Sequence, residues 1–253
     1  MRHLANLRHL TRLFLEIKLT PGCLQHLQHL TALRQLACGG VLDDAELLHL
    51  KKVKLLQVLT VWDVQGTGQG FQVLQQLPKL EELALHRTKT DTLQLTSLPS
   101  LLRLHFQKCR IGNLDFNLLP TLQTVNINGL TTESITVSDL PKIEWLSFSL
   151  VDADKIRQVS LQGMPALKTL KLVPITPEAG IEDIRYVANL DDRLLADVAK
   201  LPSLENLSIR FSAITDAGLE QLLSGPKIKW LEITGPNISK PAMQRLRKAL
   251  GSW

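Results

Sequence analysis

One short segment, L-x-x-L-x-L, usually preceded by proline, recurs along the whole chain. It occurs as LPKLEELAL, LPSLLRLHF, LPTLQTVNI, LPKIEWLSF, MPALKTLKL and LPSLENLSI, and without the proline as HLTRLFL, LTALRQLAC and VKLLQVLTV. Its first apolar residue falls at Leu10, Leu33, Leu56, Leu80, Leu101, Leu122, Ile143, Leu167, Leu204 and Ile228, at intervals of 23, 23, 24, 21, 21, 21, 24, 37 and 24 residues. A chain built from such copies must bury the apolar side of each copy against its neighbours.

The spacing within each copy predicts a strand. In LEELALHRT, the leucines at 80, 83 and 85 face inward, and Glu82, Ala84 and His86 face outward, because strand side chains alternate. Each inward leucine contributes about 1.5–3 kcal/mol when fully buried. The pattern resembles the leucine-rich repeat family across the whole chain, in its ribonuclease-inhibitor-like and cysteine-containing forms, such as those of F-box receptors and bacterial proteins. The resemblance implies an α/β solenoid, a curved arc of about ten repeats whose parallel strands line the concave side.

The segments between the strands predict the convex side. ITDAGLEQL, LDDAELLHL, LTPGCLQHL, QGTGQGFQVL and ISKPAMQRL place apolar residues at helical spacing after a capping residue. DTLQLTSLP, GNLDFNLLP and ESITVSDLP, from the three 21-residue units, alternate with period 2 and favour extended backbone. We therefore expect short convex helices at both ends of the arc and extended segments in the middle.

We expect one domain over residues 1–253, with a C-terminal capping helix near 240–251 and no separate N-terminal cap. The interval of 37 residues indicates an acidic insertion near 174–190, interpreted either as a protruding element offered to a partner or as a tolerated surface insertion. The uncapped N-terminal edge suggests a longer protein, a partner that covers the edge, or oligomerisation through it.

The sequence predicts no enzyme, cofactor or metal site. GTGQG (66–70) has the setting of a phosphate cradle, but it aligns with ITDAG of another repeat and lacks the lysine of a Walker loop. His26 and His29 lie three apart on an expected helix, without a third metal ligand nearby. Three scattered cysteines do not make a disulfide framework, and neither a signal peptide nor an apolar run long enough to span a membrane is present. The sequence therefore favours a cytoplasmic protein.

Function is expected on the concave strands, whose outward positions include three of the four tryptophans. Tryptophan and arginine are enriched in binding hot spots, and an exposed tryptophan gains little from folding alone. The candidate partner-binding residues are Trp62, His86, Arg87, Arg103, His105, Lys108, Trp145 and Trp230. The tryptophans would be apolar anchors and the cations would complement acidic groups, and a contiguous patch is expected from Trp62 to Trp145. The alternative is that the tryptophans only cover neighbouring strands.

These features predict a non-catalytic protein–protein recognition module that binds a partner protein or peptide on its concave sheet face. One alternative is the sensing or substrate-recognition arm of a larger protein, such as a ubiquitin-ligase receptor or a signalling ATPase. Another is a receptor for an anionic ligand or nucleic acid through the basic patch, because the net charge of the chain is +5.

Overall fold

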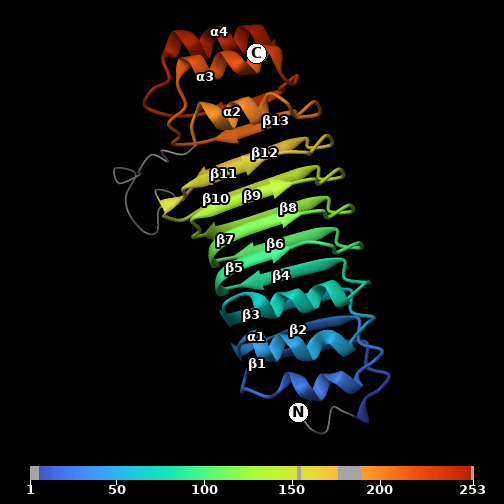
Figure 1. Cartoon of the computed structure of the whole chain (residues 1–253). Coiled ribbons are helices and arrows are strands. Elements are labelled where there is room, and N and C mark those ends of the chain that lie inside the picture. Colours follow the sequence, from blue (N-terminus) through green and yellow to red (C-terminus); the bar gives the residue numbers. More distant parts are fainter. Residues whose placement is uncertain (1–5, 153–154, 176–189, 252–253) are drawn as a thin grey trace.

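The computed structural model describes residues 6–152, 155–175 and 190–251. Within them the chain is α/β, with fourteen strands that pair in parallel and a smaller number of short helices. The elements stack in chain order into an elongated molecule, with β1 (Arg12–Leu19) near one end and α4 (Lys240–Leu250) at the other (Figure 1).

One face of the stack, here called the long sheet, runs the length of the molecule. Its strands in the described part of the chain are, in spatial order, β1, β2 (Gln35–Leu42), β3 (Val58–Gly66), β4 (Glu82–His86), β6 (Arg103–Gln107), β8 (Thr124–Leu130), β10 (Trp145–Leu150), β12 (Thr169–Pro174), β13 (Asn206–Ile209) and β14 (Trp230–Ile233).

The opposite side changes from helix to strand and back along the stack (Figure 1). Its middle is the short sheet, formed by β5 (Lys89–Leu95), β7 (Arg110–Asn117), β9 (Ser134–Ser138) and β11 (Gln158–Leu161). Towards β1 this side has η2 (Leu24–His29), α1 (Asp44–Leu47), η3 (Leu48–Lys52) and η4 (Gln69–Gln76). Towards the C-terminal end it has α2 (Asp192–Val198), α3 (Asp216–Glu220), η7 (Gln221–Ser224) and α4.

The alternation of helical and extended segments was predictable from residue spacing, with one difference. β5, β7 and β9 fall in the three 21-residue units that were expected to be extended. β11 is a fourth such strand, in a 24-residue unit where none was expected. Its four residues, QVSL, place two apolar side chains at alternate positions, which is too short a run to stand out in the sequence.

The core lies between the two sides and is made of the repeated leucines. Leu80, Leu83 and Leu85 are each at most 1% exposed. The proline that precedes most copies of the repeat belongs to a turn before the strand. In one copy, the N–H of Leu80 donates to the carbonyl of Leu77 at 3.1 Å, which closes a turn with Pro78 at its second position. Proline fits there because its fixed φ matches the turn. The same type of bond precedes most strands of the long sheet, for example from Leu101 to Leu98 and from Leu122 to Leu119.

Aspartates near helix starts connect successive units. Asp44, Asp192 and Asp216 accept hydrogen bonds from Thr67, Thr215 and Ser239, and each acceptor lies 23 residues before its donor. Asp44 accepts from both the backbone N–H and the hydroxyl of Thr67, each at 2.8 Å. These bonds hold each unit at a fixed offset from the next.

Helix α4 occupies the position of the expected C-terminal helix. The Ser239 hydroxyl accepts from the N–H of Ala242 at 3.2 Å, which caps its first turn, and Ala242 and Leu246 are buried. Most of the expected acidic insertion, residues 176–189, lies outside the described residues.

Candidate functional site

The outward side chains of the long sheet form three rows, because neighbouring strands pair in register. The row at the start of the strands is Val58, Glu82, Arg103, Thr124, Trp145, Thr169, Asn206 and Trp230. The middle row is Thr60, Ala84, His105, Asn126, Ser147, Lys171, Ser208 and Glu232. The row at the end begins Trp62, His86, Gln107, Asn128 and Ser149.

Trp62 lies against its own sheet. It is half-buried, and its register partner on β2 is Gly39. A Cβ atom at position 39 would overlap the indole ring, so the ring rests on the glycine backbone. This tryptophan therefore covers β2, as the alternative interpretation of the outward tryptophans expects.

The charged residues next to Trp62 are engaged within the chain. Arg87 binds the carboxylate of Asp63 through Nε at 2.8 Å and Nη2 at 2.9 Å. This hydrogen bonding raises the pKa of the Arg87 guanidinium. Nδ1 of His86 lies 3.0 Å from Oε1 of Gln107, and the His86 and His105 ring centroids are 6.0 Å apart. Lys108 is exposed and directly follows β6.

Arg103 is also paired across the strands. Its Nε donates to Oε2 of Glu82 at 3.0 Å, and both side chains are partly exposed. An exposed pair of this kind contributes about 0–1 kcal/mol to folding. Arg87 and Arg103, two of the three arginine and lysine residues expected in the basic patch, thus form ion pairs with neighbouring carboxylates.

Trp145 and Trp230 differ from Trp62 because both remain exposed, 38% and 44% respectively. They begin β10 and β14, so three strand spacings separate them, about 14 Å. Nζ of Lys171 lies between them, 4.9 Å from the centroid of Trp145 and 6.0 Å from that of Trp230. We call Trp145, Lys171 and Trp230 the indole–lysine cluster.

The floor of the indole–lysine cluster is polar, and most of its polar groups are paired with one another. Thr169 is buried, and its hydroxyl accepts from Nδ2 of Asn206 at 3.2 Å. Ser208 is buried and donates to Oε2 of Glu232 at 2.7 Å, and Nε of Arg210 lies 3.5 Å from Oε1 of the same carboxylate. The floor residues hold one another, so an added ligand would contact the indoles and the ammonium group.

The structure divides the expected patch in two. Trp62 lies in the row at the end of the strands, and Trp145 lies in the row at their start, four strands away. His86, Arg87, His105 and Lys108 lie near Trp62, whereas Trp230 lies near Trp145. Lys171 joins the second group and was missed as a site residue. Its outward position on a strand between two tryptophan-bearing strands was the signal available in the sequence.

The backbone N–H groups of the glycine segment GTGQG donate to a carboxylate of the chain itself, that of Asp44. Oδ1 of Asp44 accepts from the N–H groups of Gly68 at 3.2 Å and Gly70 at 2.9 Å, and Oδ2 accepts from Thr67. Although burial opposes ionisation, these hydrogen bonds lower the pKa of Asp44. The N–H groups that could cradle a phosphate therefore hold two units together.

The cysteines and the two histidines of η2 form no metal-binding cluster among the described residues. Burial raises the pKa of Cys38 to about 12, and it also raises that of Cys109. His26 and His29 lie on η2, and over the described ranges no cluster of three or more His, Cys, Asp or Glu is placed to hold a metal ion.

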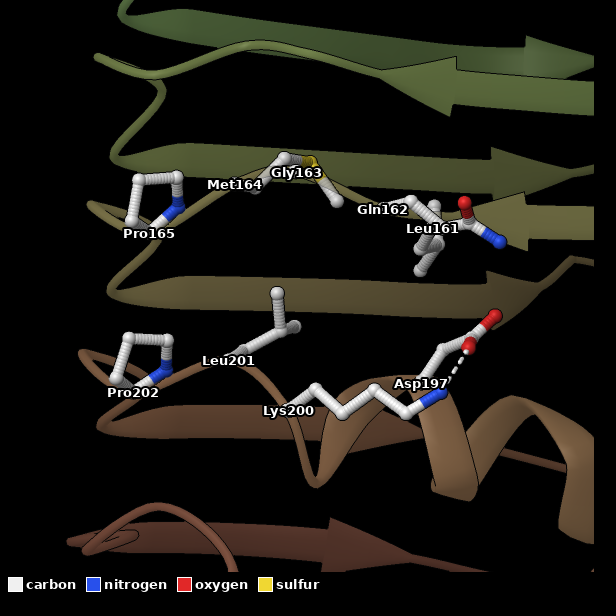
Figure 2. Close-up of a pocket in the computed structure, with 9 residues that line it drawn as sticks. All are labelled: Leu161, Gln162, Gly163, Met164, Pro165, Asp197, Lys200, Leu201 and Pro202. Carbon is white, nitrogen blue, oxygen red and sulfur yellow. Dashed lines mark hydrogen bonds and ion pairs between the residues drawn. The ribbon is translucent and has the colours of Figure 1, made fainter.

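A crevice opens on the side opposite the long sheet, where the short sheet gives way to α2 (Figure 2). Its volume is about 490 Å³, and Leu161, Met164 and Leu201 line it together with Pro165 and Pro202. Its charged side chains, Asp197 and Lys200, pair with each other at 3.3 Å. The crevice lies where the strands of the short sheet are followed by helices.

Across the described part of the chain, none of the helices has the length and apolar composition that crossing a membrane requires. No protein-family model matches the chain, and no curated protein matches it at a significant level.

Proposed function

We propose that this chain is a leucine-rich-repeat protein that acts as a non-catalytic recognition module and binds a partner protein or peptide on the long sheet. The family assignment is supported by a parallel strand within each L-x-x-L-x-L segment and by burial of its leucines. Repeats of this kind present a continuous surface along the stack, and such surfaces commonly bind other macromolecules.

The observation that carries the proposal is the exposure of Trp145 and Trp230 beside Lys171. Burial of one large aromatic side chain is worth several kcal/mol at an interface, and residues of this type dominate binding energies. Trp62 shows that this chain can cover an outward indole with its own backbone. Trp145 and Trp230 keep more than a third of their surface in solvent, which suits contact with a partner.

The test compares two folded variants as baits. Trp145→Ala/Trp230→Ala removes both indoles, and Leu118→Ala removes an apolar side chain that is even more exposed, 59%, next to the short sheet. A partner that binds the long sheet is expected to bind the double variant at least roughly 30-fold more weakly, the equivalent of about 2 kcal/mol. The Leu118 variant is expected to retain the wild-type affinity. Equal affinity for all three proteins would refute the proposal.

A further inference from the structure

We propose that the indole–lysine cluster recognises an acidic peptide, with Lys171 binding a carboxylate and Trp145 and Trp230 contacting the side chains on either side of it. This inference rests on the proposed function, because it names the chemistry of the partner at the same surface.

The first argument is the charge of the cluster. No carboxylate lies within ion-pair distance of Nζ of Lys171 among the residues that the structure describes. Neighbouring charges on the same sheet are paired: Lys168 with Glu144 at 3.0 Å, Lys229 with Glu205 at 2.8 Å, and Arg210 with Glu232 at 3.5 Å. Among these described charges around the cluster, Lys171 is the cation without a carboxylate at ion-pair distance, so a partner's carboxylate can pair with it.

The second argument is the position of the ammonium group. The two indoles hold Nζ within cation–π distance, so the lysine side chain lies along the sheet surface between them. A carboxylate that reaches this nitrogen must approach between two apolar ring surfaces. Charge-assisted hydrogen bonds strengthen where water is excluded. The indoles would exclude water from the pair while contacting apolar groups of the peptide.

The third argument is the strand geometry. The strand positions of Trp145 and Trp230 are about 14 Å apart, across β12 and β13. Their ring centroids are closer, at most about 11 Å apart, because they lie 4.9 Å and 6.0 Å from the same Nζ atom. An extended peptide of roughly four residues covers the distance between the rings at about 3.3 Å per residue. The matching sequence is therefore a short segment with an Asp or Glu and an apolar side chain within two residues of it on each side.

The test uses a random heptapeptide library displayed on phage, selected on the folded wild-type chain. Each enriched peptide is then synthesised, and its affinity is measured for wild type, Trp145→Ala/Trp230→Ala, Lys171→Met and Lys142→Met. Lys142 is an exposed lysine in the turn before β10, so its substitution removes the same charge elsewhere. We expect the peptides that depend on the two tryptophans to contain Asp or Glu, to bind Lys171→Met about tenfold more weakly, and to bind Lys142→Met as tightly as wild type.

Failure of this inference differs from failure of the proposed function. Tryptophan-dependent peptides that are neutral or basic, or that bind Lys171→Met normally, would overturn the acidic ligand and leave recognition on the long sheet standing. Absence of any tryptophan-dependent peptide would overturn both. Sedimentation of the same proteins tests another occupant: a wild-type dimer that dissociates in the Trp145→Ala/Trp230→Ala variant would identify a second copy of the chain in place of the peptide.

Discussion

The indole of Trp62 rests on the backbone of Gly39, its register partner on the neighbouring strand. The two residues are 23 positions apart, one unit of the repeat, so the indole of one unit covers the backbone of the unit before it. The same long sheet thus contains one tryptophan that packs on a neighbouring strand and two that remain exposed. This contrast is the basis for placing recognition at Trp145 and Trp230.

Gly39→Ala is predicted to destabilise the chain by about 1–3 kcal/mol, because the new methyl group must displace the indole. Urea unfolding measures the change, and a shift of Trp62 fluorescence reports displacement of the ring. In a double-mutant cycle with Trp62→Ala, the cost of Gly39→Ala is expected to shrink, since the overlapping ring is gone. Additive costs would show that the contact does not exist.

Asp44→Asn is predicted to lower the free energy of unfolding by about 1–2 kcal/mol, because the neutral amide is a weaker acceptor for the donors on Thr67, Gly68 and Gly70. Asp91→Asn is the matched control, since Asp91 is an exposed carboxylate on β5. Chemical denaturation of the two variants should separate them. Indistinguishable midpoints would contradict a role for Asp44 in joining units.

Stability is predicted to fall in acid through the same aspartates. Although burial opposes it, hydrogen bonding lowers the pKa of Asp44, and hydrogen bonds from Ser239 lower that of Asp216. A carboxyl whose folded pKa is depressed stabilises the fold above its unfolded value of about 3.9, and this stabilisation is lost as pH falls through the folded pKa. Unfolding measured from pH 6 to pH 2 should therefore show a flatter dependence for Asp44→Asn/Asp216→Asn than for wild type. Parallel curves would contradict the assignment.

Leu118→Asn is predicted to stabilise the chain by up to about 1 kcal/mol. Leu118 is exposed and has φ of 51°, a left-handed conformation that disfavours most side chains and that asparagine tolerates better. Leu48 is similarly exposed but has φ of −60°, so Leu48→Asn is not expected to stabilise. Thermal unfolding of the pair distinguishes relief of backbone strain from a general gain on removing an exposed leucine.

Thiol reactivity is predicted to separate the three cysteines. Cys23 is half-buried, whereas burial raises the pKa of Cys38 to about 12 and also raises that of Cys109. Because the thiolate is the reactive form, a thiol reagent at pH 8 should modify Cys23 first and the other two only after unfolding. Mass spectrometry of partly labelled protein identifies the order, and early labelling of Cys38 would contradict the described packing.

The repeat made much of the architecture predictable. Leu80, Leu83 and Leu85 are buried as their spacing requires, and the period-2 segments form β5, β7 and β9. Several contacts between units could also have been predicted by comparing residues that lie one repeat period apart in the sequence. Asp63 and Arg87 are 24 residues apart, and Glu82 and Arg103 are 21 apart.

The candidate site was less predictable, because outward direction does not tell what covers a side chain. Trp62 and Trp145 are both outward residues of a strand, yet only Trp62 lies over a glycine. Their rows follow from the repeat, because Trp145 lies two residues after Ile143 and Trp62 lies six after Leu56, the first apolar residue of each copy. Lys171 could be identified as a site residue only from the structure, which places its ammonium group between two indole rings.

Recognition on the long sheet is tested most directly by photo-cross-linking. A benzophenone amino acid replaces Ser149, at the end of β10, or Leu118, beside the short sheet, and each protein is irradiated in native lysate. We predict that the probe at position 149 forms discrete adducts and that these disappear when Trp145→Ala/Trp230→Ala is added. The probe at position 118 is expected to form none of these adducts. Adducts from position 118 alone, or adducts from position 149 that persist without the two tryptophans, would contradict binding at the indole–lysine cluster.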